Sequence, residues 1–362
     1  MKELQDYPAA ERSKLNVGYM RLTDAAPFII AKERGIFAAC GLDVTLHQEI
    51  SWANLRDKLA SGDLDAAQML APLPAMCTLG VSGLRVHMLT GLVLSHNGNA
   101  ITLNTSLWYE IQSLFEAGKV VSIPQALRYL ALRRDTPMAF ATVHAFSTHT
   151  LLLRRWLQSA GLHPDRDVRT VVVPPSQMVD SLEMGLVDGF CVGEPWNTIA
   201  KQSGVGETIA LGQDIWPDAP EKVLAVRADV HDAAPHAHHR LRVALLQACS
   251  WLDVADHRRQ AVPILAREEF LDLPQPALLP ALANGLAASG RGFDSRVQPL
   301  HTFYGEHINR PNFDVAYSMV RECTEMLGKP LSRDVISSVV DSTWRTDLYE
   351  QSRARLDEIP LS

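Results

Sequence analysis

The sequence predicts an α/β protein with two similar lobes, a central ligand cleft between them and a helical C-terminal region. Strand-like and helix-like segments alternate along the first two thirds of the chain, and connections between parallel strands are long and usually helical. A pattern of helix, Gly, Asp and strand also occurs twice with the same spacing, at Leu59, Gly62 and Asp65 and at Leu182, Gly185 and Asp188. With 362 residues, 47% of them hydrophobic, two domains are expected.

The first lobe begins with a β-α-β pattern. Its predicted elements are a strand at residues 15–20, a helix at 24–41, a strand at 42–48, a helix at 51–62 and strands at 64–70 and 85–94. Both helices have apolar residues at helical spacing and end near a glycine, and Ser51 is a candidate N-cap. The alternation of these elements predicts a mainly parallel sheet.

The second lobe repeats this order. Its predicted elements are a strand at residues 138–143, a helix at 148–161, a strand at 168–173 and the second copy of the repeated pattern at 176–196. Helix, Gly, Asp and strand is a common connection, so chance recurrence is an alternative, but a Gly-Leu helix end before both copies favours two lobes. We assign residues 1–103 and 221–362 to the first lobe and residues 104–220 to the second.

Composition and charge argue against several classes of function. A net charge of −7 and a pI near 6.0 give no basic surface for nucleic acid, so direct nucleic-acid binding is not expected. No apolar run is long enough for a membrane span. The charged N-terminal residues, among them Lys2, Glu3 and Asp6, lack the apolar stretch of a secretory signal, so a cytoplasmic location is expected if Met1 is the native start.

The cysteines form an odd, widely scattered set with no C-x-x-C pair. They are Cys40, Cys77, Cys191, Cys249 and Cys323. This arrangement indicates neither a disulfide framework nor a zinc site, and predicts buried free thiols.

Ligand-binding residues are expected where helices begin beyond the carboxyl ends of the strands. Trp52 and Pro175 occupy equivalent positions there, seven residues before Leu59 and seven residues before Leu182. An indole N–H suits a ligand made of hydrogen-bond acceptors, although packing is the alternative explanation for Trp52.

Four polar residues are further candidates for ligand binding, and each also has a simpler structural explanation. Asn99 lies near the predicted hinge and could belong to a turn, and His149 begins a helix, where a solvated histidine is common. Glu194 could act as a general acid or base, but no partner carboxylate or activated nucleophile is recognisable, so no catalytic residue is assigned. Lys222 begins a predicted return strand and could supply a cation, or be a surface lysine.

Histidines gather in the helical region that follows. They are His231, His236, His238 and His239. Asp232 and His236 have the spacing of metal ligands on a helix, but Pro235 between them argues against a continuous helix. The sequence therefore predicts a solvated helix start and no metal site.

Five segments together resemble the nitrate- and bicarbonate-binding branch of the type II periplasmic solute-binding proteins. They are VGYMRLTDAAPFIIAKERGIF, SWANLRDKLASGDLDAAQML, NGNAIT, STHTLLLRRWL and VDGFCVGEPW. VGEPW and SW…RDKL are fairly specific for this branch, whereas TDAAPFIIAKERGIF also occurs in sulfonate, taurine and thiamine-precursor binders. The resemblance implies the two-lobed fold of that class.

The resemblance also implies a nitrate pocket. Its residues would be Trp52, Asn99, His149 and Lys222, lined by Leu22 and Pro175, with Glu194 of VGEPW nearby. Nitrate is planar and offers only acceptors, which indole, amide, imidazole and ammonium donors can satisfy. The transporter proteins tend to carry Gln where this chain has Asn99, so the preference between nitrate and nitrite is left open.

Transporter-linked members of the branch are exported or lipid-anchored, and this sequence shows no signal peptide or lipobox cysteine near its start. In this it resembles the NasS-type cytoplasmic nitrate/nitrite sensors, which are understood to hold an RNA-binding NasT-type antiterminator inactive until ligand binds. The resemblance implies a sensor with nitrate or nitrite as ligand, a NasT-type partner and no cofactor.

Two alternatives remain. One is a solute-binding component of an ABC transporter for nitrate, bicarbonate or a sulfonate, with a misassigned start codon. The other is an enzyme related to the thiamine-precursor synthases, which would need a reactive Cys or His cluster. The isolated Cys191 gives little support to an enzyme.

Overall fold

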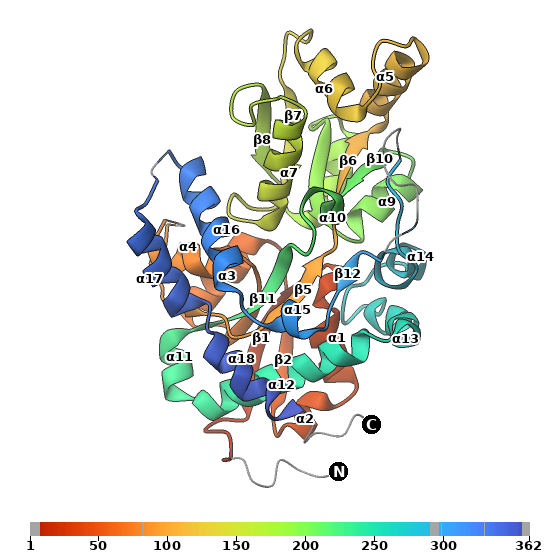
Figure 1. The fold of residues 1–362 in the computed structure, drawn as a ribbon. Coiled ribbons are helices and arrows are strands. Elements are labelled where there is room, and N and C mark those ends of the chain that lie inside the picture. The colour runs from red at the N-terminus through yellow and green to blue at the C-terminus, as the bar shows by residue number, and fades with distance from the viewer. Residues whose placement is uncertain (1–7, 82, 290–296, 298, 329, 357–362) are drawn as a thin grey trace. The chain divides into compact units, whose positions relative to one another are not determined.

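The structure is a computed structural model that describes residues 8–81, 83–289, 297, 299–328 and 330–356 (Figure 1). The chain forms two compact units. The first comprises Met1–His96, Pro220–Asp272 and Thr302–Ser362, and the second comprises Asn97–Ala219 and Leu273–His301. Lys2, Glu3 and Asp6 of the charged N-terminal segment lie outside the described residues.

The described part of the first unit is built on a seven-stranded mixed sheet. Its strands are β1 (Lys14–Met20), β2 (Asp43–Glu49), β3 (Ala66–Leu70), β4 (Met88–Leu89), β5 (Val93–Asn97), β11 (Pro220–Arg227) and β12 (His301–Thr302). The order is β12-β5-β11-β3-β1-β2, and β4 pairs with β11. β2, β1 and β3 are parallel, whereas β11 is antiparallel to β3, β4 and β5. The expectation of a mainly parallel sheet is therefore wrong for its second half, because β11 returns from the second unit.

Helices pack around this sheet. They are η1 (Thr23–Ala25), α1 (Ala26–Glu33), α2 (Ile36–Ala39), α3 (Trp52–Ser61), α4 (Leu73–Leu79), α11 (Ala228–Ala233), α12 (Pro235–Leu252), α13 (Ala255–Leu265), α15 (Glu306–Asn309), α16 (Phe313–Met326), α17 (Arg333–Thr343) and α18 (Thr346–Arg353). The helical C-terminal region is thus confirmed. Its longest helix, α12, is buried along most of its length and packs against α1, α2, α13 and α18.

The second unit has a five-stranded sheet of order β10-β6-β9-β7-β8 among its described residues. The strands are β6 (Asn99–Asn104), β7 (Met138–Thr142), β8 (Val168–Val172), β9 (Gly189–Gly193) and β10 (Gly206–Leu211). The helices are α5 (Thr105–Glu116), α6 (Ile123–Ala131), α7 (Thr148–Ser159), η2 (Pro175–Gln177), α8 (Met178–Glu183), α9 (Trp196–Gln202), α10 (Gly212–Ile215), α14 (Gln275–Leu279) and η3 (Pro280–Asn284). Here too three strands are parallel, β8, β7 and β9, and β6 runs against β9.

Residues 273–301, assigned by sequence to the first lobe, are grouped with the second unit. Ala288 and Leu300 pack against Ala100 and Leu211 in a small apolar cluster. The Ser289 N–H donates to the Thr208 carbonyl at 2.8 Å. These contacts join residues far apart in sequence, which local patterns do not indicate.

The repeated Asp has the same structural role in both units. The Asp65 N–H donates to the Asn16 carbonyl at 2.8 Å, and Asp65 Oδ2 accepts from the Asn16 N–H at 2.7 Å. The Asp188 N–H donates to the Ala139 carbonyl at 2.7 Å, and Asp188 Oδ2 accepts from the Ala139 N–H at 2.8 Å. Each Asp therefore joins the beginning of β3 or β9 to the neighbouring parallel strand.

An arginine supports each of these carboxylates. Arg12 lies 2.7 Å from Asp65, and Arg134 lies 2.8 Å from Asp188. The glycines before them, Gly62 and Gly185, have φ of 92° and 67°, the left-handed conformation in which helices commonly end. The repetition in the sequence thus reflects a repeated way of starting a strand.

Two predicted elements are interrupted. The helix expected at 24–41 breaks at Gly35, whose φ is 68°. The strand expected at 85–94 is divided into β4 and β5, and the intervening Thr90 N–H donates to the Thr343 carbonyl at 2.7 Å. A Cβ at Gly91 would lie 2.6 Å from Leu348 Cβ. Contacts with the C-terminal helices therefore end the first part of the strand.

The chain passes between the two units at residues 96–97, 219–220, 272–273 and 301–302, which are called crossings here. Residues near three of these crossings have unusual backbone conformations. Asn97, Asp218 and Asp272 have φ of 61°, 52° and 48°, and are the non-glycine residues of positive φ among those the structure describes. Each lies within two residues of a crossing. Asn and Asp tolerate this left-handed region better than most residues.

The predicted solvated histidine cluster is wrong in part. Pro235 does separate α11 from α12, as expected. His238 and His239, however, are buried, and the Nδ1 atoms of His231 and His238 lie 3.0 Å apart. Burial holds the pKa of His238 well below its ordinary value. The packing of α12 against other helices explains this burial.

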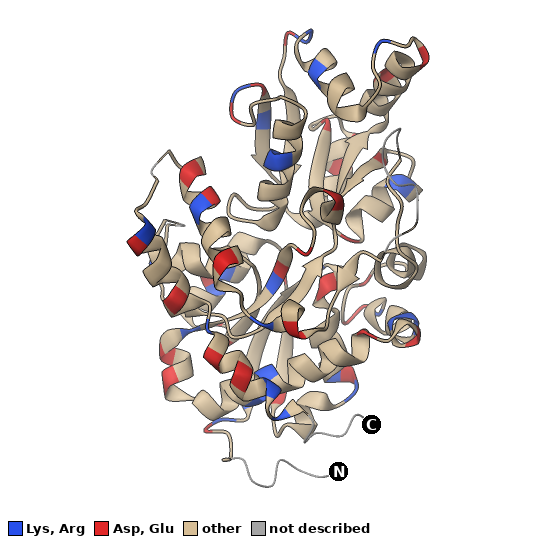
Figure 2. Ribbon diagram, viewed as in Figure 1, with Lys and Arg blue, Asp and Glu red and all other residues tan. Residues whose placement is uncertain are grey.

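The cysteines, the distribution of charge and the helix lengths complete the description of the fold. All five cysteines are buried and none forms a disulfide bond, which confirms the prediction of buried thiols. Basic and acidic residues are interspersed in both units (Figure 2). Among the described residues, none of the helices combines the length and the apolar character needed to cross a membrane.

We expect Asp65→Asn and Asp188→Asn each to lower the free energy of unfolding by about 1.5–3 kcal/mol, because each weakens hydrogen bonds to a charged group. Asp57→Asn, which removes the same charge from a side chain that is 51% exposed, is the matched control and should change it by at most about 0.5 kcal/mol. Urea unfolding measures all three. Variants as stable as the control would contradict the role assigned to the repeated Asp.

Candidate functional site

Three predicted ligand-binding residues lie at one edge of the first sheet. β1 and β2 end together, with Met20 opposite Glu49, and Lys222 at the start of β11 pairs with Leu70 at the end of β3. Leu22 follows β1, and Trp52 begins α3 after β2. The carboxyl ends of the parallel strands therefore place Leu22, Trp52 and Lys222 at the same edge.

Trp52 offers a buried donor at this edge. Its side chain is fully buried, and within the described part of the chain Nε1 has no hydrogen-bond partner. The Ser51 hydroxyl accepts from the Asn54 N–H at 3.1 Å and so caps α3 immediately before Trp52. Buried donors are rarely left unpaired, so this one requires an explanation. A bound acceptor would provide one.

Lys222 lies beside this indole. Its Nζ is 5.1 Å from the centroid of the Trp52 ring, a cation–π arrangement. The same Nζ is 2.8 Å from Asp24 Oδ2 and also contacts Glu221 Oε1. Burial lowers the pKa of the Lys222 ammonium, but the charges of Asp24 and Glu221 more than offset this and leave the pKa raised. The lysine is therefore a charged, fully buried group and not a surface residue.

The orphaned indole is not unique, since Nε1 of Trp156 and Nε1 of Trp344 also lack a partner among the described residues. Trp52 differs from them in its place at the strand edge and in the ammonium next to its ring. An ammonium has three N–H donors; Lys222 donates to Glu221 Oε1, and Asp24 Oδ2 lies within ion-pair distance of the same nitrogen. Indole and ammonium together can serve an acceptor-rich ligand.

The second sheet places the other predicted residues along its own corresponding edge. β7, β8 and β9 are parallel and end there, and β6 begins there, with Asn99 opposite Gly193. His149 follows β7, Pro175 follows β8 and Glu194 follows β9, and all three side chains are buried. The structure thus places these four predicted residues at a common edge of the second sheet.

His149 and Asn99 are held by close local packing. The Ser147 hydroxyl caps α7 by accepting from the Thr150 N–H at 3.1 Å, and the Thr150 hydroxyl donates to the Thr142 hydroxyl oxygen at 3.0 Å. This fixes the first turn of α7, which carries His149, to the end of β7. A Cβ at Gly212 would lie 3.0 Å from the Asn99 carbonyl oxygen, so glycine permits the close approach of α10.

Glu194 lies between β9 and α9 and has partners in the first turn of α9. Its Oε2 accepts from the Thr198 hydroxyl at 2.7 Å and from the Thr198 N–H at 3.2 Å, in the first turn of α9. Burial raises the pKa of Glu194 to about 7, against hydrogen bonds from Thr198 and Asn197 that lower it. These contacts account for the carboxylate as a cap of α9, and they involve no catalytic partner.

The chain resembles known proteins over most of its length. The family described as NMT1-like matches residues 8–266. The nitrate/nitrite binding protein NrtA from Synechocystis is 31% identical over 369 residues, covering 98% of this chain and 80% of that protein. The chain belongs to the NMT1-like family. Its crystallised relative, periplasmic NrtA from Synechocystis, superposes with a TM-score of 0.87 at 30% identity, covering 98% of this chain and 93% of that one.

Two further relatives match this chain with different coverage. The nitrate import ATP-binding protein NrtC from Synechocystis is 37% identical over 305 residues, covering 84% of this chain but only 44% of NrtC. The bicarbonate-binding protein CmpA from Synechococcus is 31% identical over 292 residues, covering 78% of this chain and 64% of CmpA. The chain thus lies in the nitrate- and bicarbonate-binding branch and has the predicted solute-binding-protein fold. NrtA and CmpA are both named as binding proteins, which fits a binding role at the family level.

Three polar residues of this NMT1-like protein were missed from the sequence. Gln68 Nε2 donates to Asp24 Oδ1 at 2.7 Å, and Gln68 Oε1 accepts from the Met20 N–H at 2.9 Å. Glu221 completes the group around Lys222. Two adjacent charged residues followed by four apolar ones were the available signal for Glu221, whereas nothing local marks Asp24 or Gln68.

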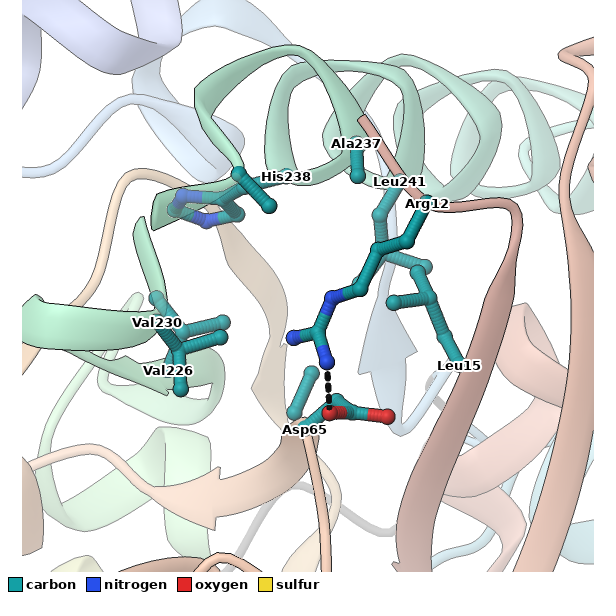
Figure 3. Close-up of a pocket in the computed structure, with 10 residues that line it drawn as sticks. Arg12, Leu15, Asp65, Val226, Val230, Ala237, His238 and Leu241 are labelled. Carbon is teal, nitrogen blue, oxygen red and sulfur yellow. Dashed lines mark ion pairs between the residues drawn. The ribbon is translucent and has the colours of Figure 1, made fainter. Parts of the chain in front are cut away.

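A separate small cavity lies elsewhere in the first unit (Figure 3). Its volume is about 10 Å³, room for about one water molecule, and its lining includes the Arg12–Asp65 ion pair and His238 but none of the predicted ligand-binding residues. In the part of the chain that the structure describes, no group of three or more His, Cys, Asp or Glu is placed to hold a metal ion.

The pKa of Glu194 generates a stability prediction. Its ordinary value is 4.5 and its folded value about 7, so between these the folded protein retains a proton that the unfolded chain releases. Stability from this group is full below pH 4.5 and is lost as the pH rises through about 7. Glu194→Gln keeps an acceptor for Thr198, so the free energy of unfolding should fall less across this interval than in the wild type. Equal pH dependence in chemical unfolding would contradict the assignment.

Proposed function

We propose that the chain is a nitrate- or nitrite-binding sensor whose ligand-dependent closure controls a regulatory protein. The observation that supports it most is the buried Trp52 N–H, without a partner among the described residues, beside the Lys222 ammonium. In this proposal Trp52, Lys222, Asn99 and His149 donate to the anion, and Leu22 and Pro175 exclude water.

The chemistry of the donors suits this class of ligand. Nitrate and nitrite carry only acceptor atoms, and a hydrogen bond to a charged group is stronger than one between neutral groups. NrtA is named for binding nitrate and nitrite and shares 31% identity over nearly the whole chain. Both considerations favour a small monovalent oxyanion as the ligand.

The sensor role comes from the resemblance to NasS-type proteins. In this proposal the chain acts in the cytoplasm and releases a NasT-type antiterminator when the anion binds. A ligand shifts such an equilibrium only if it binds the two states with different affinity. The alternative is a solute-binding component of an ABC transporter for nitrate, bicarbonate or a sulfonate, favoured by the similarity to CmpA.

A thermal-shift screen of nitrate, nitrite, bicarbonate, sulfate and taurine tests the ligand, because binding to the native state raises Tm. We expect nitrate or nitrite to give the largest rise. A rise with bicarbonate or taurine alone would favour the alternative.

Substitutions of Trp52 and Pro175 test whether the indole N–H donates to the anion. Trp52→Phe keeps the ring and removes the N–H, so the Kd for nitrate should rise by about 10- to 150-fold, the equivalent of about 1.5–3 kcal/mol. Pro175→Ala, at the equivalent position of the second unit, removes no donor and should have a clearly smaller effect. Equal losses in isothermal titration calorimetry would count against the role of Trp52.

Mixing experiments test the regulatory role. A purified NasT-type protein should co-elute with the chain in size-exclusion chromatography without anion and separate from it when nitrate is added. Trp52→Phe should shift the release to higher nitrate concentrations. Absence of a complex under both conditions would reject this partner.

A further inference from the structure

Gln68 is a buried polar residue of β3 that the proposed contacts with the anion do not include. Its side chain and that of Lys222 are fully buried, and Asp24 is only 1% exposed. Gln68 Oε1 accepts from the Met20 N–H at 2.9 Å, and Gln68 Nε2 donates to Asp24 Oδ1 at 2.7 Å. Asp24 Oδ2 lies 2.8 Å from Lys222 Nζ. These contacts form one chain from the backbone of β1 to the ammonium.

The amide of Gln68 has a fixed orientation in this chain of contacts. The Met20 N–H is a donor, so the amide oxygen faces it and the amide nitrogen faces Asp24. The two carboxylate oxygens of Asp24 are then divided, one toward the amide and the other toward Lys222. A hydrogen bond to a charged group is stronger than one between neutral groups, which favours this arrangement. Gln68 thus sets the direction in which Asp24 presents its charge.

Lys222 depends on contacts from outside its own strand for its position. Its side chain is long and flexible, and a second ion-pair partner, Glu221, is the preceding residue of β11 and so moves with that strand. Asp24 lies in η1, after β1, and gives the ammonium an anchor outside β11. The Lys222 Nζ is 5.1 Å from the centroid of the Trp52 ring. The position of the ammonium beside the indole therefore depends on Asp24.

An amide is suited to the position of Gln68 for a chemical reason. A carboxylate there could accept from the Met20 N–H but would place a like charge beside Asp24, and an apolar side chain would leave a buried N–H unpaired. We infer that Gln68 is a positioning residue that acts through Asp24 to hold the Lys222 ammonium where it can donate to the anion. This inference rests on the proposed function, because it takes Lys222 to be a donor to the ligand.

Isothermal titration calorimetry with nitrate tests this role. Gln68→Met keeps the length of the side chain but removes the amide, and should raise the Kd for nitrate by about tenfold. Lys222→Gln removes the ammonium, and in that background Gln68→Met should raise the Kd by at most about twofold further. A structural role that does not act through Lys222 would raise the Kd by the same factor in both backgrounds, and would overturn the inference.

Two control variants separate positioning from a loss of stability. Asp65→Asn is expected to lower the free energy of unfolding through a contact at the start of β3, the strand that carries Gln68. Gln125→Met removes an amide of the second unit that also accepts from a backbone N–H, that of Val121 at 2.8 Å. Both should leave the Kd for nitrate unchanged. A rise in either control as large as in Gln68→Met would overturn the inference.

A measurement without ligand keeps the inference testable if Lys222→Gln does not fold. In protein labelled with fluorotryptophan, the fluorine NMR resonance that disappears in Trp52→Phe belongs to Trp52. Gln68→Met should shift this resonance, because the ammonium beside the ring moves, whereas Asp65→Asn should not. An unchanged resonance in Gln68→Met would overturn the inference. Wild-type protein that binds neither nitrate nor nitrite would instead reject the proposed function, and the inference with it.

Discussion

The buried ammonium of Lys222 is the constraint on which the edge of the first sheet depends. A lysine cannot be buried charged unless counter-charges and acceptors surround it. Asp24 and Glu221 supply the charges, and Gln68 links Asp24 to the backbone of β1. The parts that meet this requirement come from η1, β3 and β11, so the antiparallel return of β11 is needed to assemble them.

In each sheet, different kinds of side chain lie at the amino ends and at the carboxyl ends of the parallel strands. At the amino ends of β3 and β9, Asp65 and Asp188 bind backbone groups of the neighbouring strand and an arginine. At the opposite edge, polar residues follow the strands directly. The repeated pattern that dominates the sequence therefore secures the sheets, and the residues that differ between its copies, above all Trp52 and Pro175, lie where chemistry can differ.

Local patterns predicted the order of strands and helices well, because apolar spacing and helix-ending glycines are local properties. They also predicted helix starts at Trp52 and His149 and the start of a strand near Lys222, and the structure has all three there. Features that depend on distant contacts escaped prediction. Among these are the division of β4 from β5 by the C-terminal helices, the burial of the α12 histidines and the role of Asp24.

The central place of β11 has a consequence for synthesis of the chain. In the part of the chain that the structure describes, the five strands of the second sheet lie between Asn99 and Leu211, so that sheet can form while residues after 219 are still being made. The first sheet cannot form completely until β11 has been made, because β11 lies between β5 and β3 and is translated after both. Until then β3 and β5 have unpaired edges, a state open to misassociation. The sheet whose strands begin later in the sequence is thus able to form first on the ribosome, before residues 273–301 join its unit.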